Sequence, residues 1–145
     1  MFFSKRLITI IIVFIGITLA YTACRSINQN KVLKNEQIEF IKLKCIQLCE
    51  DWEDKPFLDR DYTDKTSVDI YRTAIRDSIP MEGSLDYGAE FELNIYYKDQ
   101  TVQGYHLSLS KSKGYSGLLV ALSDTEQGYS IEVKDADQIR DLIWK

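Results

Sequence analysis

The chain has 145 residues, of which 45% are hydrophobic, 28% charged and 12% aromatic, and this composition is typical of a globular protein rather than a disordered one. Its formal net charge is −4, and a modest acidic balance does not attract phosphates, so nucleic acid is not an expected partner. The length suffices for a single domain once a leader is set aside.

Residues 1–23 have the pattern of a secretory signal. A short basic start with Lys5 and Arg6 precedes an uncharged apolar run at residues 7–20, and small residues end the segment. A buried core helix does not fit, because this run is apolar on all sides. The pattern predicts export from the cytoplasm.

Cys24 follows directly. In a bacterial lipoprotein, the cysteine after such a signal receives a diacylglycerol on its thiol, and Thr22-Ala23-Cys24 fits the end of that motif, whereas Tyr21 departs from it. The alternatives are an uncleaved anchor helix, because residues 7–24 are uncharged and just long enough to span a bilayer, and a freely secreted protein. The favoured interpretation is lipidation of Cys24, with the domain outside the cytoplasm on the cell membrane.

Residues 24–36 are polar and are expected to tether a single domain at residues 37–145. At 38–48 the apolar residues fit both a strand and a helical stripe, and the strand is preferred. Residues 50–65 are crowded with charge and contain Pro56, which predicts a loop.

A helix is predicted from Thr66, which has capping-box spacing to Asp69, up to Pro80. Its inward face consists of residues at helical spacing: Val68, Tyr71, Ile75 and Ile79. Four strands should follow, because apolar residues alternate with polar ones from Phe91 onward and short turns separate the runs. Asp135 and Gln138 resemble a second capping box, which starts a final helix with inward residues Ile139, Leu142 and Ile143.

The expected order is strand, helix, four-strand meander, helix. Tight hairpins require antiparallel pairing, and each strand has one apolar face. The sequence therefore predicts an α+β domain in which both helices cover one face of an antiparallel sheet and the other face is exposed to solvent.

The exported part contains few residues that could carry chemistry. Cys45 and Cys49 are expected to be buried and free: an exported compartment permits a disulfide, but residues four apart on a strand lie roughly 13 Å from each other. With His106 as the sole histidine, they cannot supply four zinc ligands, so no metal is expected. No phosphate loop, serine elbow or metalloprotease pattern occurs, and no cofactor is expected.

Tyrosines offer the clearest candidates for binding. Tyr87, Tyr96 and Tyr115 fall outside the predicted core faces. Exposed tyrosines favour binding surfaces, because they bring large contact area with few rotamers to immobilise. These three are the candidate binding residues.

The domain resembles the YhfM-like domain of small lipoproteins from Bacillus-type Gram-positive bacteria. The resemblance covers roughly residues 37–143 and rests on Thr63-Asp64-Lys65, Ala74-Ile75, Gly83, Phe91-Glu92-Leu93-Asn94-Ile95-Tyr96-Tyr97, Tyr105-His106-Leu107 and Tyr129-Ser130-Ile131. It implies a strand before the first helix and a lipoprotein signal, which supports lipidation of Cys24. The family has no established activity, so no catalytic residue is implied.

Two functions remain open. The first is a non-enzymatic module that binds a protein, a peptide or the cell wall, for example in an immunity or exclusion role. The alternative is an extracytoplasmic hydrolase that uses His106 with acids from residues 50–64. The binding module is the preferred hypothesis.

Overall fold

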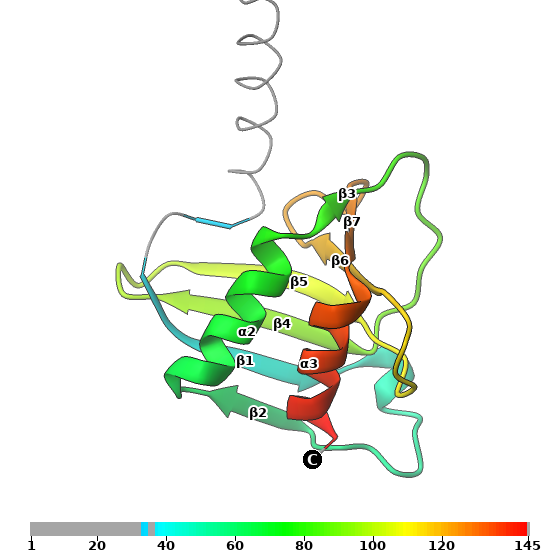
Figure 1. The fold of residues 1–145 in the computed structure, drawn as a ribbon, viewed down its shortest axis with the longest axis horizontal. Coiled ribbons are helices and arrows are strands. Elements are labelled where there is room, and N and C mark those ends of the chain that lie inside the picture. The colour runs from blue at the N-terminus through cyan, green and yellow to red at the C-terminus, as the bar shows by residue number, and fades with distance from the viewer. Residues whose placement is uncertain (1–32, 35–36, 145) are drawn as a thin grey trace, which may run out of the picture. The chain divides into compact units, whose positions relative to one another are not determined.

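The computed structural model describes residues 33–34 and 37–144. Every helix and strand described below lies in one compact unit, Asn35–Lys145. The elements are β1 (Ile38–Cys45), the 3-10 helix η1 (Gln47–Cys49), β2 (Asp59–Tyr62), α2 (Lys65–Arg76), β3 (Ile79–Pro80), β4 (Phe91–Tyr97), β5 (Val102–Ser108), β6 (Gly117–Ala121), β7 (Gly128–Ile131) and α3 (Val133–Ile143) (Figure 1).

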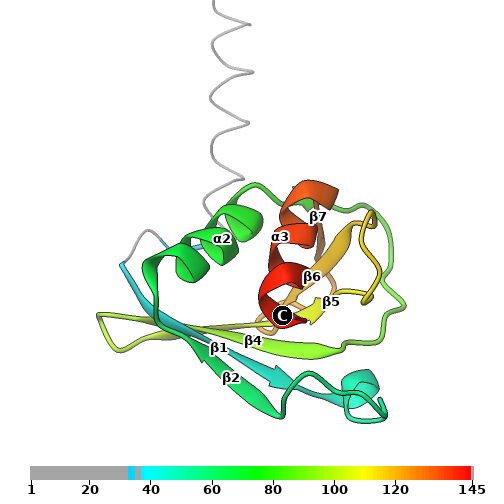
Figure 2. The same ribbon diagram turned by 60° about the horizontal axis from the view of Figure 1, so that its bottom comes forward.

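The strands form one sheet of seven, in the order β2-β1-β4-β5-β6-β7-β3, and every neighbouring pair is antiparallel. Both helices lie on the same face of this sheet, as Figure 2 shows. The predicted class, α+β with an antiparallel sheet, is confirmed. The predicted order lacks two strands, β2 and β3, which form the two edges of the sheet.

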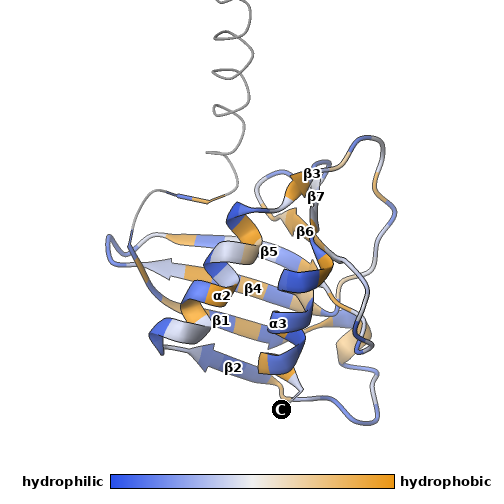
Figure 3. Cartoon of the chain, in the orientation of Figure 1, coloured by the Kyte–Doolittle hydropathy of each residue, from blue (hydrophilic) through white to orange (hydrophobic). Residues whose placement is uncertain are grey.

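The core lies between the helices and the sheet. Along β4, alternate residues from Phe91 to Tyr97 are at most 1% exposed, whereas the residues between them are half-buried. Figure 3 shows this alternation as bands of apolar and polar colour along the strands. The period of two therefore decides which side chains face the helices, and the intervening ones form the opposite face.

The N-cap of helix α2 lies two residues before the predicted one, and the helix starts at Lys65. The side chain of Asp64, not Thr66, caps it, with Oδ1 accepting a hydrogen bond from the Ser67 backbone N–H at 2.9 Å. The helix ends at Arg76, so Ile79 lies in β3 and is 54% exposed. The predicted inward position of Ile79 is therefore wrong, while Val68, Tyr71 and Ile75 are buried.

Helix α3 also starts earlier than predicted, at Val133 after the N-cap residue Glu132. Asp135 is consequently inside the first turn and only 4% exposed, instead of capping the helix. The inward positions of Ile139 and Ile143 are confirmed, since both are 1% exposed.

The expectation of free cysteines is wrong, because Cys45 and Cys49 form a disulfide. The distance argument assumed a continuous strand, but β1 ends at Cys45 and Gln47 adopts a φ of 42°. This turn starts η1 and brings the two Cα atoms within 5.4 Å of each other. Both residues are buried, as expected.

Strand β2 lies within the segment that the charge pattern predicts as a loop. It pairs with β1, where Asp61 faces Lys42 across the strands at 3.4 Å. On the other face, Arg60 Nη1 donates to the carbonyl oxygen of Leu142 at the end of α3, at 3.0 Å. Tyr62 is the one buried residue of the strand, and its ring centroid lies 5.1 Å from that of Tyr71 on α2, so a single aromatic contact takes the place of an alternating apolar stripe.

Candidate binding surface on the open face of the sheet

The face of the sheet opposite the helices carries an apolar row of two half-buried rings and one exposed aliphatic side chain. In register across β1, β4 and β5, Phe40 pairs with Tyr96 and Tyr96 with Val102. The Phe40 and Tyr96 rings stack, with centroids 4.3 Å apart and planes 9° from parallel, and Val102 is 52% exposed. The two rings therefore form a flat platform with an aliphatic side chain beside it.

The next row adds one more apolar side chain. Lys42, Asn94 and Gly104 are neighbours across β1, β4 and β5. Because Gly104 has no side chain, Leu122 leans over it, with Cδ1 2.8 Å from where a Cβ would stand. Leu122 is 40% exposed, and it extends the apolar surface toward β6. We call Phe40, Tyr96, Val102 and Leu122 the apolar patch.

Polar groups border the patch in the following rows of β1 and β4. Lys42 is paired with Asp61, and Asn94 Nδ2 donates to Glu92 Oε1 at 2.7 Å. Lys44 is exposed and has Glu92 as its register partner on β4. The patch is thus an apolar centre with a polar border, the arrangement found at protein interfaces.

A strap, residues 81–90, covers the other part of the same face. Leu85 packs over Gly128: a Cβ added at Gly128 would lie 2.9 Å from both methyl carbons of Leu85. The Tyr87 hydroxyl is 3.0 Å from His106 Nδ1. Val120 belongs to this face by register, yet it is 0% exposed. The strap therefore withdraws the β5–β7 half of the face from solvent.

Both ends of the strap are anchored by hydrogen bonds. The Met81 backbone N–H donates to the Gly128 carbonyl at 2.9 Å, and Ser108 Oγ donates to the Gly88 carbonyl at 2.6 Å. Glu90 is the last residue of the strap, and burial raises the pKa of its carboxyl above the usual 4.5, although a hydrogen bond from the Leu109 backbone N–H opposes that shift. These contacts fix the boundary between the covered and the open part of the face.

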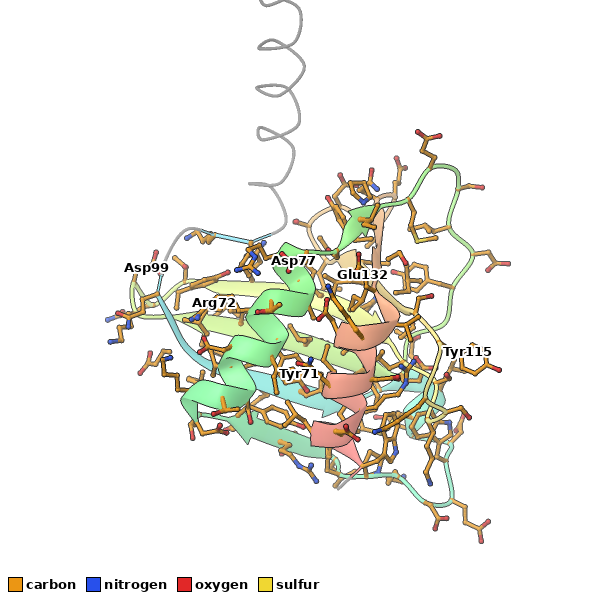
Figure 4. All side chains as sticks on the ribbon, in the orientation of Figure 1. Tyr71, Arg72, Asp77, Asp99, Tyr115 and Glu132 are labelled. Carbon is orange, nitrogen blue, oxygen red and sulfur yellow. A yellow bond between two sulfur atoms is a disulfide. The ribbon has the colours of Figure 1, made fainter. Side chains whose placement is uncertain are left out.

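The three candidate tyrosines lie in three different surroundings. Tyr96 belongs to the apolar patch, and Tyr87 lies in the strap and contacts His106. Tyr115 is 63% exposed in the β5–β6 connection, where its side chain points away from the fold (Figure 4). The structure therefore places Tyr96 beside three residues that sequence reasoning missed: Phe40, Val102 and Leu122.

The structure does not bring His106 together with the acids of β2. In register, Asp59 pairs with Lys44, Lys44 with Glu92, and Glu92 with His106, so two strands separate Asp59 from the histidine. Three strand spacings amount to roughly 14 Å, which is beyond hydrogen-bond reach. The nearest partner of the imidazole is the Tyr87 hydroxyl.

Within residues 33–34 and 37–144, no three His, Cys, Asp or Glu side chains are grouped so that they could hold a metal ion. In the same residues, no helix is both long enough and apolar enough to cross a membrane. Cys24, and with it the predicted signal and most of the tether, lies outside the described residues.

The fold and the patch together define a small antiparallel α+β domain with one face covered by helices and an exposed apolar patch on the other. Residues 49–145 match the family described as YhfM protein, which is more than half of the chain, so the chain belongs to the YhfM family. No curated protein and no solved structure matches the chain. The resemblance to a YhfM-like domain is confirmed.

Proposed function

We propose that this protein is a non-enzymatic binding module, lipidated on Cys24 and held at the outer surface of the cell membrane. Its apolar patch receives a partner, which we take to be a protein or a peptide rather than a cell-wall polymer. An immunity or exclusion role, in which the tethered domain blocks an incoming protein, is one specific version of this proposal. The observation that carries the proposal is the stacked, half-buried pair of Phe40 and Tyr96 beside the exposed side chain of Val102.

The chemistry of the patch supports protein recognition. Stacked aromatic rings with Val102 and Leu122 beside them offer large contact area, and their rotamers are already restricted by packing. Aromatic side chains are enriched among the residues that dominate binding energy, and a polar border such as Lys42 and Glu92 is typical of the rim of an interface.

The disulfide supports a location outside the cytoplasm. Structural disulfides persist in oxidising compartments and are rare in the cytosol, where thiols are kept reduced. A bridge between Cys45 and Cys49 therefore agrees with the export that the N-terminal sequence predicts. The hydrolase alternative has less support, because the register separates His106 from Asp59.

Anchoring is tested by replacing Cys24 with Ala and following membrane fractionation, electrophoretic mobility and incorporation of labelled palmitate. If Cys24 is lipidated, the variant should incorporate no palmitate, and its signal peptide should no longer be removed. If parent and variant are both unlabelled, have the same mobility and stay at the membrane, the N-terminal segment is an uncleaved anchor helix instead.

Binding is tested with a photo-reactive amino acid at position 102, inside the patch, and at position 115, in the β5–β6 connection. The proposal predicts protein adducts from position 102, their loss when Tyr96 is replaced by Ser, and no matching adducts from position 115. Identical adducts from both positions, or adducts that survive Tyr96→Ser, would argue against the patch as the binding surface. Circular dichroism establishes that the variants are folded.

A further inference from the structure

The strap, residues 81–90, is an extended segment with two different sides. Exposed residues alternate with less exposed ones along its second half: Ser84, Asp86 and Gly88 are exposed, whereas Leu85, Tyr87 and Ala89 are half-buried or buried. A period of two is that of an extended chain with one side against a surface. The strap therefore lies against the sheet through alternate residues, as a bound peptide would.

The two ends of the strap are fixed to different elements. At its start, Gln127 Nε2 donates to the Met81 carbonyl at 3.1 Å. At its end, the Ala89 backbone N–H donates to Gln47 Oε1 at 3.2 Å, and the Leu48 backbone N–H donates to the Ala89 carbonyl at 3.3 Å, both partners belonging to η1. Both attachments lie outside the middle of the strap, so they do not require that the middle stays on the sheet.

Two side chains hold the middle of the strap. Leu85 meets Leu118 of β6 over Gly128, because a Cβ added at Gly128 would lie 2.9 Å from the methyl carbons of Leu85 and 3.2 Å from Leu118 Cδ1. The Tyr87 ring centroid lies 5.8 Å from that of His106, and the Tyr87 hydroxyl lies 3.0 Å from His106 Nδ1. One apolar contact and one polar contact therefore keep this stretch closed.

The backbone of the middle is not paired with the sheet. Within the described part of the chain, no backbone hydrogen bond joins residues 82–87 to another segment. Gly83 has a φ of 102°, which residues with a side chain rarely adopt, and nothing lies within 4 Å of where its Cβ would stand. In contrast, β6 is hydrogen-bonded to β5 on one side and to β7 on the other. Segments with few contacts open at a lower free-energy cost than paired strands do.

The strap covers apolar surface that continues the apolar patch. Val120 lies two residues before Leu122 along the chain and is 0% exposed, whereas Leu122 is 40% exposed. The Leu122 backbone N–H donates to the Gly104 carbonyl at 3.0 Å, so the pairing of β6 with β5 extends to Leu122. Leu118, two residues before Val120, is half-buried beneath Leu85. Residues two apart on a strand share a face, so an open strap would join these three side chains in one apolar surface.

We propose that the strap is a displaceable cover of the sheet. Its middle lifts away while its two ends and the sheet stay in place, and the opening extends the apolar patch from Leu122 to Val120 and Leu118. In the closed state, Leu85 and Tyr87 occupy this surface as an internal ligand, and the apparent affinity of a partner for the larger surface is reduced by the fraction of closed molecules. That a partner uses this surface rests on the proposed function, whereas the opening of the strap does not.

Thiol labelling measures the opening. Val120→Cys and Leu119→Cys add a thiol at neighbouring positions of β6 that are both 0% exposed, the first beneath the strap and the second in the core under the helices. The full-length variants, in nanodiscs without reductant, react with a neutral maleimide at a concentration where the rate is proportional to the fraction of open molecules. Mass spectrometry of the peptide with the added thiol excludes signal from Cys24. Circular dichroism establishes that the variants are folded, and Leu118→Cys is a second reporter beneath the strap.

We expect Val120→Cys to react at least about tenfold faster than Leu119→Cys. Below the unfolding transition, urea should hardly change the rate at position 120, because strap opening exposes little surface, whereas the rate at position 119 should rise with urea as global unfolding does. Leu85→Ser should raise the rate at position 120 about tenfold, because it removes an apolar contact of the strap.

A core variant separates strap opening from global unfolding. Ile139→Val in α3, at a position that is 1% exposed, should raise the rate at position 119 about fivefold and leave the rate at position 120 unchanged. Leu58→Ser, at an exposed position in the β1–β2 connection, is the matched control for Leu85→Ser and should leave position 120 unchanged.

The proposal is wrong if positions 119 and 120 share one rate and one urea dependence, or if Ile139→Val accelerates both equally. It is also wrong if Leu85→Ser leaves the rate at position 120 unchanged, or if Leu58→Ser raises that rate as strongly. Cross-linking from position 102 does not depend on these rates. Its failure would remove the partner and leave the opening of the strap, so the two failures are distinguishable.

Discussion

Arg140 connects α3 to the β5–β6 turn through Tyr115: its Nη1 donates to the Tyr115 carbonyl oxygen at 2.8 Å while the guanidinium is almost completely buried, with Arg140 only 2% exposed. The same group donates to the Ser110 carbonyl at 2.7 Å and to Asp137 Oδ1 at 2.7 Å. One buried cation therefore holds a connection that has no regular structure of its own.

Replacing Arg140 by Ala should lower the free energy of unfolding by about 3 kcal/mol, because it removes a buried guanidinium that donates to the Ser110 and Tyr115 carbonyl oxygens and pairs with Asp137. Urea denaturation at constant m-value measures the loss. Lys111→Ala, at an exposed site in the same connection, should change stability by less than about 0.5 kcal/mol. An equal loss in both variants would contradict the structural role of Arg140.

Replacing Cys45 and Cys49 together by Ala should lower the free energy of unfolding by about 2 kcal/mol, the chain-entropy value for so short a loop. The reduced parent protein should lose a similar amount, whereas the double variant should not respond to reductant. Hydrogen exchange should rise first in residues 46–58, because the disulfide fixes the start of that segment. A parent protein whose stability is insensitive to reductant would contradict this prediction.

Asp135→Asn should stabilise the protein at neutral pH. Burial raises the pKa of the Asp135 carboxyl above its usual 3.8, so the folded chain binds a proton more readily than the unfolded chain. The free energy of unfolding therefore falls as pH rises from about 3.8 through the folded-state pKa, and the asparagine variant avoids that loss. Melting temperatures of parent and variant should converge at acidic pH and separate toward neutrality.

Asp77 provides a control, because its replacement should change the melting temperature in the opposite direction. The hydrogen bond from Arg76 lowers the pKa of the Asp77 carboxyl, so that group contributes stability above its usual pKa of 3.8 and loses it as pH falls. Asp77→Asn should therefore lower the melting temperature at neutral pH. If Asp135→Asn and Asp77→Asn shift the melting temperature at neutral pH in the same direction, the two carboxylates do not act as described.

Gly128→Ala should release the strap. The added Cβ would stand 2.9 Å from both methyl carbons of Leu85, so Leu85 must move away from the sheet, at a cost of about 1 kcal/mol. Hydrogen exchange should then rise in residues 82–88 and at Val120, while α2 stays protected. Thr125→Ala in an exposed turn is the control, and unchanged exchange in the strap would contradict the packing described.

Much of the fold was predictable because β4 alternates strictly and α2 has a clear apolar face. Strand β2 was not, since Asp59, Arg60 and Asp61 carry no alternation and become a strand only by pairing with β1 across the sheet. The disulfide could not be predicted from the sequence for a related reason. It depends on the backbone turn at Gln47, and no residue pattern indicates that turn.

The apolar patch was predictable only in part. Tyr96 was identified, because its position on the polar face of a strand is visible in the alternation. Phe40 lies on the equivalent face of β1, but its significance depends on the register that brings it against Tyr96. Leu122 joins the patch because Gly104, on a neighbouring strand, has no side chain. These are relationships between strands, which the order of residues along one strand does not contain.

The charged edge of the sheet has a consequence for self-association. Two copies could pair symmetrically through β2, with the two strands antiparallel. Directly opposed residues in such a pair lie on the same face of the sheet, so each residue would face either itself or a residue an even number of positions away in the other copy. A pair centred on Asp59, Arg60 or Asp61 would then place two identical charges opposite each other. At the other edge, Pro80 in β3 cannot donate a backbone hydrogen bond. Both borders of the sheet thus disfavour growth into longer β-assemblies, even where many copies crowd together.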